Sequence, residues 1–295
     1  MTEEGICFFA YNNDQIDYAK LAVVAAAYTK KFLNKPVCLI TDEGTWAWLQ
    51  QSHDIAYVKR VIDDVVITND EMKRNTRVHN DSPWTEFRAQ FSNSNKHKVF
   101  EYSPYDKTLL LDIDYIVKTN FLNHAYDAYT GVAMFDRAVS IRNDLPHPNE
   151  RWLFDGGVKM WWSTVIYFDK SQESKLFFDT WAHVADHYNY YQFLYNFPLG
   201  LFRTDYCVSI AAHILDGMNA GDTVSNFGNA VMQNLWQKDD IVGINTVTDW
   251  ACLAHDPREN WKNILVRHDK YDVHVMNKRA LDRMIPKIKE LNDGI

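Results

Sequence analysis

The chain has 295 residues, of which 46% are hydrophobic and 24% are charged, and it contains only 11 glycines and 8 prolines. This composition excludes a disordered or low-complexity protein and predicts one large α/β domain or two small ones. The formal net charge of -8 argues against broad, non-specific binding to nucleic acid or to an anionic membrane.

The sequence carries no sign of export or of a membrane anchor. Its first residues are acidic, the apolar run after them is too short for a signal peptide, and nowhere do about 18 apolar residues run together. The four cysteines lie far apart without a Cys-x-x-Cys pair, so neither a zinc ribbon nor a disulfide framework is indicated. We expect a cytoplasmic protein that does not contact the membrane.

The N-terminal part of the chain predicts a parallel β-α-β unit. Residues 6–13 are typical of a buried strand, residues 14–34 of a helix rich in alanine, and residues 35–45 of a second apolar strand. A shorter helix over residues 45–52 and a third strand over residues 54–61 would extend the unit. Strand, helix and strand at this spacing form a parallel crossover.

The central part of the chain is polar before it becomes apolar. Residues 59–82 predict a long loop or a short helix, and residues 84–91 predict a helix. Residues 105–117, with the sequence YDKTLLLDIDYIV, then predict a buried strand. This strand is unusual because it carries two acids, Asp112 and Asp114.

The C-terminal part predicts two more strands and three helices. The strands are expected over residues 131–137 and 163–171, on either side of the proline-rich residues 142–152. Apolar side chains from Phe177 to Tyr195 recur at spacings of three and four, which predicts a long helix whose aromatic stripe packs in the core. Another helix begins at Asp205, and a basic helix ends the chain.

Familiar nucleotide and hydrolase motifs are absent. Residues 10–14, AYNND, follow the first strand without a glycine-rich turn, and neither G-x-G-x-x-G nor G-x-x-x-x-G-K-[ST] occurs anywhere. The G-x-S-x-G elbow and the H-E-x-x-H helix are absent too. The sequence therefore disfavours a dinucleotide-dependent dehydrogenase, a P-loop NTPase and the common hydrolase classes.

The strongest chemical signal is Asp112-Ile113-Asp114. In an extended backbone the two carboxylates would project together while Ile113 faces the core. Two carboxylates this close repel each other unless a cation lies between them, and hard oxygen ligands suit Mg²⁺ or Mn²⁺, which also bind substrate phosphates. The alternative is a chance motif that caps a loop. The buried strand favours the metal, because charge at its end needs compensation.

From its first strand to the Asp-x-Asp, the sequence resembles the GT-A nucleotide-sugar glycosyltransferases, most nearly the glycogenin and bacterial galactosyltransferase type. The resemblance rests on AYNN after the first strand and on LLLDID, and covers about the first two thirds of the chain. It implies an α/β, Rossmann-like GT-A fold with a mixed, mainly parallel sheet flanked by helices. Residues 1–295 would form one domain, with a nucleotide-sugar-binding half (1–118) and an acceptor half that includes the C-terminal helix (119–295).

The resemblance also implies a donor site. Three residues would line the uridine pocket: Ala10, Tyr11 and Asn12. Asp112 and Asp114 would hold Mn²⁺ or Mg²⁺ against the diphosphate of a UDP-sugar. Arg88, on the helix expected before the Asp-x-Asp strand, would contact the donor, although a surface charge is an equal alternative.

A late histidine would be the third metal ligand, and a lysine after it would meet the phosphates. His274 and Lys278, with Asn277 beside them, occupy the matching positions. His255 and His268 are competing candidates for the metal ligand.

Other positions concern the sugar and the acceptor. Asp205 matches the family's acid near the reacting carbon, although aspartate is also an ordinary helix N-cap. Tyr206 stands where the family usually has glutamine, which leaves the stereochemical course open. Trp161 or Trp162, beside Asp155, would stack on the acceptor; burial in the core is the favoured alternative for both tryptophans.

These residues predict transfer of a sugar from a UDP-sugar to a hydroxyl group. The compact size and aromatic content also resemble phage enzymes that glycosylate 5-hydroxymethylcytosine, which implies glucosyl or arabinosyl transfer to double-stranded DNA in the host cytoplasm. The basic residues that would contact DNA phosphates are Lys73, Arg74, Arg77, Lys96 and Lys98.

Alternatives from other classes remain open at this stage. A glycan, a protein or a small molecule could be the acceptor instead of DNA. A nucleotidyltransferase also combines a parallel sheet with two acids and a metal, although it would normally show a glycine-rich loop after the first strand. A nucleotide-sugar-binding protein without catalytic activity would share the same motif. The sequence does not predict the oligomeric state.

Overall fold

The computed structural model describes residues 3–70, 75–91, 95–142, 152–153, 157–196, 202–256, 258–259 and 262–292. The helices in these ranges are α1 (Tyr18–Leu33), α2 (Glu43–Ser52), α3 (Ile55–Val61), α4 (Val99–Tyr102), α5 (Ala125–Ala128), α6 (Gln172–Asp186), α7 (Tyr188–Leu194), α8 (Thr204–Leu215) and α9 (Lys278–Asn292), with the 3₁₀ turns η1 (Lys96–Lys98) and η2 (Phe121–His124).

The strands are β1 (Glu4–Phe9), β2 (Val37–Thr41), β3 (Asp64–Ile67), β4 (Asn75–Asn80), β5 (Glu86–Phe91), β6 (Lys107–Leu111), β7 (Tyr115–Ile116), β8 (Val132–Phe135), β9 (Ala138–Ser140), β10 (Trp152–Leu153), β11 (Val158–Lys159), β12 (Trp162–Asp169), β13 (Val224–Asn226), β14 (Met232–Leu235), β15 (Asp240–Ile244), β16 (Trp250–His255), β17 (Asn263–His268) and β18 (Val273–Val275).

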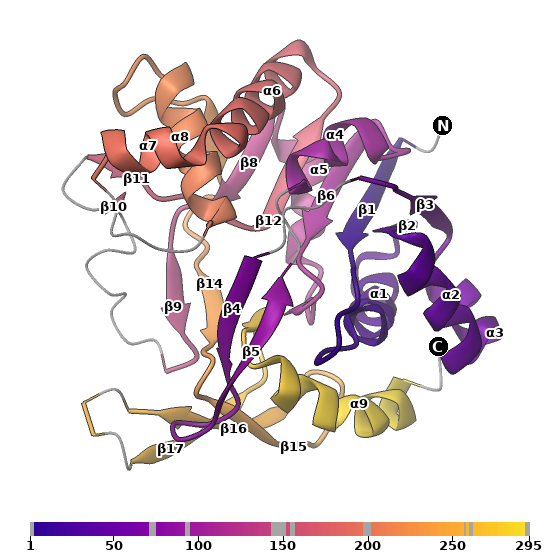
Figure 1. Ribbon diagram of the computed structural model, residues 1–295. Coiled ribbons are helices and arrows are strands. Elements are labelled where there is room, and N and C mark those ends of the chain that lie inside the picture. The colour runs from indigo at the N-terminus through magenta and orange to yellow at the C-terminus, as the bar shows by residue number, and fades with distance from the viewer. Residues whose placement is uncertain are drawn as a thin grey trace.

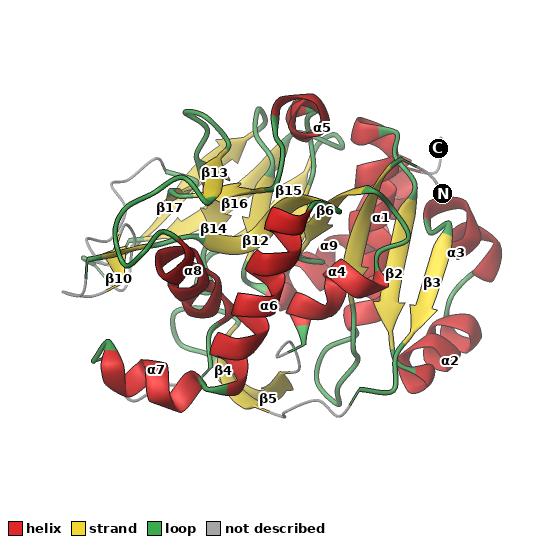
Figure 2. Ribbon diagram, turned by 90° about the horizontal axis from the view of Figure 1, so that it is seen from above, coloured by secondary structure: helices red, strands yellow, loops and turns green. Residues whose placement is uncertain are grey.

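A seven-stranded sheet in the order β13-β8-β12-β6-β1-β2-β3 forms the centre of the fold (Figure 1). Strands β6, β1, β2 and β3 are parallel, as are β13 and β8, whereas β12 is antiparallel to both of its neighbours. Helices cover both faces, with α4 and α6 on one side and α1 on the other (Figure 2). The structure therefore confirms the mixed, mainly parallel sheet flanked by helices that the sequence predicts.

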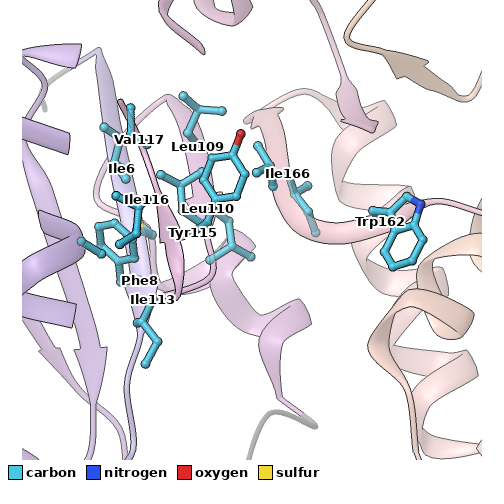
Figure 3. Packing of buried hydrophobic residues seen from close by; sticks show 14 of the residues in the cluster. Ile6, Phe8, Leu109, Leu110, Ile113, Tyr115, Ile116, Val117, Trp162 and Ile166 are labelled. Atoms are coloured by element: carbon cyan, nitrogen blue, oxygen red, sulfur yellow. The ribbon is translucent and has the colours of Figure 1, made fainter. Parts of the chain in front are cut away.

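The central strands are apolar throughout because both of their faces are covered. Ile6 of β1 pairs in register with Leu109 of β6, and both are fully buried. The chain segment after β6 packs beside β1, where Ile113 and Ile116 lie next to Phe8 (Figure 3). This packing holds the end of β6 in place.

A smaller, four-stranded sheet in the order β7-β18-β14-β9 lies beside the central sheet. Its short strand β7 follows β6 after three residues, and β18 pairs antiparallel to β7 with His274 opposite Tyr115. On its other side β18 pairs in parallel with β14, which places Asn234 opposite His274. The second sheet therefore brings residues from the C-terminal part of the chain to the end of β6.

The β4–β5 hairpin lies between α8 and α9 in Figure 1 and is attached at both ends. At one end the Arg77 guanidinium donates to the carbonyl of Phe202 at 3.2 Å. At the other, Arg283 of α9 forms an ion pair with Asp81 at 2.6 Å. The hairpin thus connects the residue before the N-cap of α8 with the second turn of α9, and these two helices are distant in the sequence.

Three sequence predictions for short segments are wrong: the strand over residues 54–61, the loop or short helix over residues 59–82, and the helix over residues 84–91. Residues 54–61, predicted as a strand, form helix α3, because the Asp54 carboxylate accepts hydrogen bonds from the Ala56 and Tyr57 amides and starts a helix. The third strand, β3, begins only at Asp64. Residues 59–82, expected as a long loop or a short helix, contain the end of α3 and the strands β3 and β4.

The predicted helix over residues 84–91 is strand β5, which pairs antiparallel with β4. In this segment Phe87 and Ala89 alternate with exposed polar residues, which is the period of a strand. Phe87 stacks on His79 of β4 with ring centroids 5.3 Å apart. Pairing with β4 therefore decides the structure of a segment whose local pattern is ambiguous.

Other predictions are confirmed or refined. Strands β8 and β12, helix α8 and the basic helix α9 occur where the sequence predicts them. The long helix from Phe177 to Tyr195 is divided at His187 into α6 and α7, and its aromatic stripe is largely buried as expected. The proline-rich residues fall mostly outside the described ranges. Among the helices of the described residues, none has the length and apolar character needed to cross a membrane.

A buried lysine ties the second sheet to the three-stranded β15-β16-β17 sheet. Lys118 follows β7, and its Nζ lies 2.7 Å from His268 Nδ1 and 3.1 Å from the Thr248 carbonyl oxygen. Burial, reinforced by Lys118, lowers the pKa of His268 to about 3. Burial also lowers the pKa of Lys118 to about 8. His268 is therefore neutral at physiological pH, with Nδ1 accepting from the lysine.

We predict that His268 makes the protein sensitive to acid. Between its folded pKa of about 3 and its ordinary value of 6.5 the unfolded chain binds the extra proton, so stability falls as the pH falls through this window. His268→Gln should flatten the dependence by up to about 1.4 kcal/mol per pH unit in urea unfolding between pH 6.5 and 4. The exposed His187→Gln is the control, and equal slopes for wild type and His268→Gln would contradict the prediction.

Candidate metal centre

The Asp-x-Asp sequence lies on a turn between two sheets and not inside one extended strand. The Asp112 amide donates to the Thr164 carbonyl at 2.9 Å, which adds a last rung between β6 and β12. The Tyr115 amide donates to the Asp112 carbonyl at 2.9 Å and closes the turn. The expected alternation of side chains along a strand is therefore wrong, but the turn still directs Asp112 and Asp114 to one place.

His274 joins the two acids at this place. One ligand atom from each of Asp112, Asp114 and His274 lies within 4.8 Å of the others, and His274 Nε2 is 3.5 Å from Asp114 Oδ1. On the other side of the ring, Nδ1 lies 3.1 Å from the Oδ1 atom of the fully buried Asn234. A proton on Nδ1 donated to Asn234 leaves the Nε2 lone pair facing the acids, which is the tautomer that a metal ligand requires.

The competing histidines lie elsewhere. His268 is buried against Lys118, and the backbone amide of His255 donates to Asp239. Within the part of the chain that the structure describes, Asp112, Asp114 and His274 form the one group of three potential ligands. Two carboxylates and an imidazole suit Mn²⁺ or Mg²⁺ and leave positions for substrate oxygens.

Two lysines balance the charge of the acids. Lys278 Nζ lies 2.5 Å from Asp114 Oδ2, and Lys96 Nζ lies 2.7 Å from Asp112 Oδ1. Burial would raise the pKa of Asp114, but Lys278 and His274 outweigh it and hold this pKa well below its usual range. Burial would lower the pKa of Lys278, and Asp114 outweighs it in turn, so the pKa of Lys278 is raised.

The position of Lys96 differs from the sequence prediction. It was expected to contact DNA phosphates at the surface, but its side chain is only 4% exposed and also donates to the Ser163 carbonyl. Lys98, another expected phosphate contact, forms an ion pair with Asp70 at 2.5 Å. Lys73 and Arg74 fall outside the described residues.

Asp205 belongs to the same network and is not a helix cap. Arg203 occupies the N-cap position of α8, and Asp205 lies in the first turn. Its Oδ1 accepts from the Ser163 amide at 3.0 Å and hydroxyl at 2.8 Å, and its Oδ2 lies 3.2 Å from Arg203 Nη2. Burial would raise the pKa of Asp205, but Arg203 and Ser163 outweigh it and hold the pKa below its usual value.

The residues after β1 are positioned mainly by contacts within the protein. Ala10 is buried, and the Tyr11 hydroxyl lies 3.2 Å from the Thr68 hydroxyl. The Asn12 side-chain oxygen accepts from the Ala19 amide at 2.8 Å, inside α1. The predicted uridine contacts of these three residues stay a prediction.

Asn277 and Arg88 have different surroundings. Asn277 is fully buried; its Oδ1 accepts from the Ala280 amide at 3.0 Å and its Nδ2 donates to the Asp239 carbonyl at 2.7 Å. It therefore fixes Lys278 at the first residue of α9. Arg88 is exposed on strand β5, so the prediction that it contacts the donor from a helix is wrong about the helix.

The tryptophans predicted to stack on an acceptor are covered. Trp161 and Trp162 are 3% and 6% exposed, and Figure 3 draws Trp162 as part of the buried cluster. Lys159 Nζ lies 4.0 Å from the centre of the Trp161 ring. Their placement agrees with the alternative of core packing. Asp155, expected beside them, lies outside the described residues.

Comparisons with known proteins give similarities of fold only. No protein-family model matches the chain, and no curated protein does. Among solved structures the chain is similar to the glycosyltransferase GlyE of Streptococcus pneumoniae TIGR4, with 13% identity over 77% of this chain and 45% of that one and a TM-score of 0.41. The chain thus spans less than half the length of GlyE.

Two further structures have comparable similarity. The galactosyltransferase LgtC, solved with donor and acceptor sugar analogues, has 14% identity over 75% of this chain and 72% of that one, with a TM-score of 0.47. Mouse xyloside xylosyltransferase 1 has 11% identity over 74% and 84% of the two chains, with a TM-score of 0.42. Similarity at this level does not establish a function, which has to be inferred from the side chains at the site.

The pairing of Asp114 with Lys278 predicts a strong effect on stability. Asp114→Asn leaves the mostly buried ammonium without its carboxylate, which should cost about 3 kcal/mol of unfolding free energy in metal-free buffer. Adding Lys278→Met to this variant should recover at least half of the loss, because the buried ammonium that lost its carboxylate is then removed as well. Urea unfolding measures both changes.

The control is Asp179→Asn, which breaks the exposed Lys175–Asp179 pair. Its effect should stay within about 0.5 kcal/mol. If Asp114→Asn were as mild as this control, or if Lys278→Met gave no recovery, the two side chains would not be energetically coupled.

Proposed function

We propose that the chain is a metal-dependent glycosyltransferase that takes its sugar from a UDP-sugar. The observation that supports this most directly is the convergence of Asp112, Asp114 and His274 beside Lys278. These residues lie where the parallel strand β6 ends, and open α/β sheets bind ligands beyond the carboxyl ends of their strands. Oxygen ligands, an imidazole and a nearby ammonium suit a divalent ion with a diphosphate.

The proposed mechanism assigns a role to each side chain. A divalent ion, when bound, would offset the charge of the departing UDP. Lys278, fixed at the start of α9 by Asn277, would donate to the same phosphates. Asp205 would orient the acceptor hydroxyl or stabilise positive charge on the reacting sugar carbon. Lys96 would hold Asp112 in a fixed position relative to Asp205, because Lys96 donates to Asp112 and to the Ser163 carbonyl, and the Ser163 hydroxyl donates to Asp205.

The donor site would use both halves of the chain. Residues 1–118 would supply the uridine pocket and the two acids, whereas His274 and Lys278 come from residues 119–295. We therefore propose one catalytic domain in which the C-terminal half completes the donor site as well as forming the acceptor site.

The acceptor is proposed to be a hydroxyl group, with 5-hydroxymethylcytosine in double-stranded DNA as the specific candidate. This candidate rests on the sequence resemblance. The basic residues expected to contact DNA phosphates give it no support, because Lys96 pairs with Asp112, Lys98 pairs with Asp70, and Arg77 donates to the Phe202 carbonyl. A hydroxyl on a glycan, a protein or a small molecule is the alternative.

The donor proposal predicts that UDP and Mn²⁺ together stabilise the protein more than either does alone. A ligand that binds only the folded state raises the melting temperature, by several degrees at saturating concentrations. Asp112→Asn and Asp114→Asn should each abolish the metal-dependent part of the shift, and Asp179→Asn should leave it intact. Thermal melting with UDP that gives no shift, or a metal-dependent shift that survives both variants, would exclude the proposed donor site.

The acceptor proposal predicts transfer of labelled sugar to hydroxymethylated duplex DNA and not to unmodified DNA of the same sequence. UDP-glucose and UDP-arabinose are tested as donors with Mn²⁺, and the Asp112→Asn variant serves as the inactive control because it lacks a metal ligand. If no donor labels the hydroxymethylated DNA while UDP still binds, the acceptor is a hydroxyl of another class. UDP binding without transfer to any acceptor would favour a binding protein.

A further inference from the structure

Two histidines are in contact at the end of helix α6. His183 lies in the last turn of the helix, and His187, four residues later, is its C-cap. The two rings have centroids 4.4 Å apart and planes inclined by 30°, and both side chains are exposed. Helix α7, which follows the pair, lies at the edge of the molecule and away from α9, which carries Lys278 (Figures 1 and 2). The histidine pair is therefore separate from the candidate metal centre.

A backbone hydrogen bond fixes the tautomer of His187. Its Nδ1 lies 2.9 Å from the carbonyl oxygen of His183. A carbonyl oxygen can only accept a hydrogen bond, so Nδ1 carries the proton and the lone pair is on Nε2. Histidines that bind metals usually donate their second ring N–H to an acceptor of this kind, which orients the ring. His187 thus has the tautomer that a metal ligand requires.

The ring of His183 is held in place from its other side. It packs edge-on against the ring of Tyr191 of α7, with centroids 6.1 Å apart. Tyr191 is buried and stacks on Tyr195. Because both imidazoles are already restricted by their neighbours, an ion that binds them loses little free energy to the ordering of side chains.

The distance between the rings matches that of two imidazoles on one ion. Metal–nitrogen bonds of about 2.0–2.1 Å, at an angle of about 90–110° to each other, place the ring centroids about 4.5–5.2 Å apart. The observed 4.4 Å is close to the lower value, which belongs to the tetragonal geometry of Cu²⁺. Residues four apart lie on one face of a helix, and paired histidines at this spacing are a known way to hold Zn²⁺.

The end of α6 also favours a cation electrostatically. The last carbonyl groups of a helix carry partial negative charge, which attracts positive ions. In the last turn of α6, all of which the structure describes, His183 is the only basic residue, so no lysine or arginine competes for this place. Two neutral imidazoles add ligand atoms without adding charge.

We propose that His183 and His187 form a second metal site, which binds a divalent transition-metal ion of the Zn²⁺ or Cu²⁺ type with water in the remaining positions. Mn²⁺ and Mg²⁺ prefer carboxylate oxygens and would bind at Asp112 and Asp114 instead. His187 ends α6 and precedes α7, so the ion would stabilise the junction of these two helices. The pair would bind its ion whatever reaction the chain catalyses.

Metal titrations of the full chain, freed of any affinity tag, test the site. A site with two of the four ligands of a structural zinc site should bind Zn²⁺ with a Kd of about 10–100 µM in calorimetry. His183→Gln and His187→Gln should each weaken this binding at least about tenfold. His274→Gln, which removes a ligand of the other metal centre, should leave it unchanged.

The matched control is His124→Gln. His124 is an exposed histidine that packs on a tyrosine ring, as His183 does, and it should not contribute to binding. With Cu²⁺ in place of Zn²⁺, pulsed electron paramagnetic resonance should show coupling to two imidazole nitrogens. Either glutamine variant of the pair should reduce this coupling to one nitrogen or remove it.

Hydrogen exchange tests the effect of the ion on the junction. At a Zn²⁺ concentration of ten times Kd, amides in residues 187–191 that exchange by local opening should exchange up to about tenfold more slowly. The slowing should be absent in His183→Gln.

Four results would overturn the proposal. Zn²⁺ binding that is unchanged in both glutamine variants of the pair would indicate an adventitious ion only. An equal loss in His124→Gln would show that binding is not specific to the pair. A Cu²⁺ ion coupled to a single nitrogen in the wild type would exclude joint binding by the two rings. Binding through both rings without slower exchange would remove the role of the ion at the junction.

Discussion

Asp112 and Asp114 are separated by a single residue, and a nearly buried turn can hold both carboxylates only if positive charge surrounds them. In this structure Lys96 supplies that charge to Asp112 and Lys278 supplies it to Asp114. Neither lysine lies close to the turn in the sequence, so it is the fold that brings each of them to the acids. The 3₁₀ turn η1 places Lys96 beside Asp112. The second sheet and the start of α9 place Lys278 beside Asp114. These elements thereby compensate the charge of the two acids.

The same constraint explains why the chain changes sheets immediately after β6. If β6 continued as one strand, its residues after Leu111 would stay in the central sheet. Instead β7 pairs with β18, and the pairing carries His274 to the acids and places Lys278 three residues after β18. Asn234 on β14 orients the imidazole, and Asn277 caps α9. Lys278, at the start of α9, would donate to a phosphate-bearing ligand at this place, while Lys96 holds Asp112.

The parts of this architecture that the sequence predicts are those with strong local signals. The apolar runs of β1, β2 and β6 and the alanine-rich α1 are recognisable because both faces of the central sheet are covered. Residues 54–61 and 84–91 are wrongly predicted because a capping aspartate and a hairpin partner decide their structure. Asn234, Lys96 and Ser163 were not predicted as members of this site for a related reason: their roles depend on contacts between residues 16 to 42 positions apart in the sequence. His274 and Lys278 could be singled out only through the family resemblance, and the fold then separates His274 from its two competitors.

The most direct test of this account is pulsed electron paramagnetic resonance of Mn²⁺ bound to the full chain in the presence of UDP. The account predicts coupling of the ion to one imidazole nitrogen, which disappears in His274→Gln, together with coupling to the phosphorus nuclei of UDP. A bound ion that couples to phosphorus but to no nitrogen would remove His274 from the site. An ion that shows the same signals after Asp112→Asn and Asp114→Asn would contradict the central claim that these two carboxylates hold the metal.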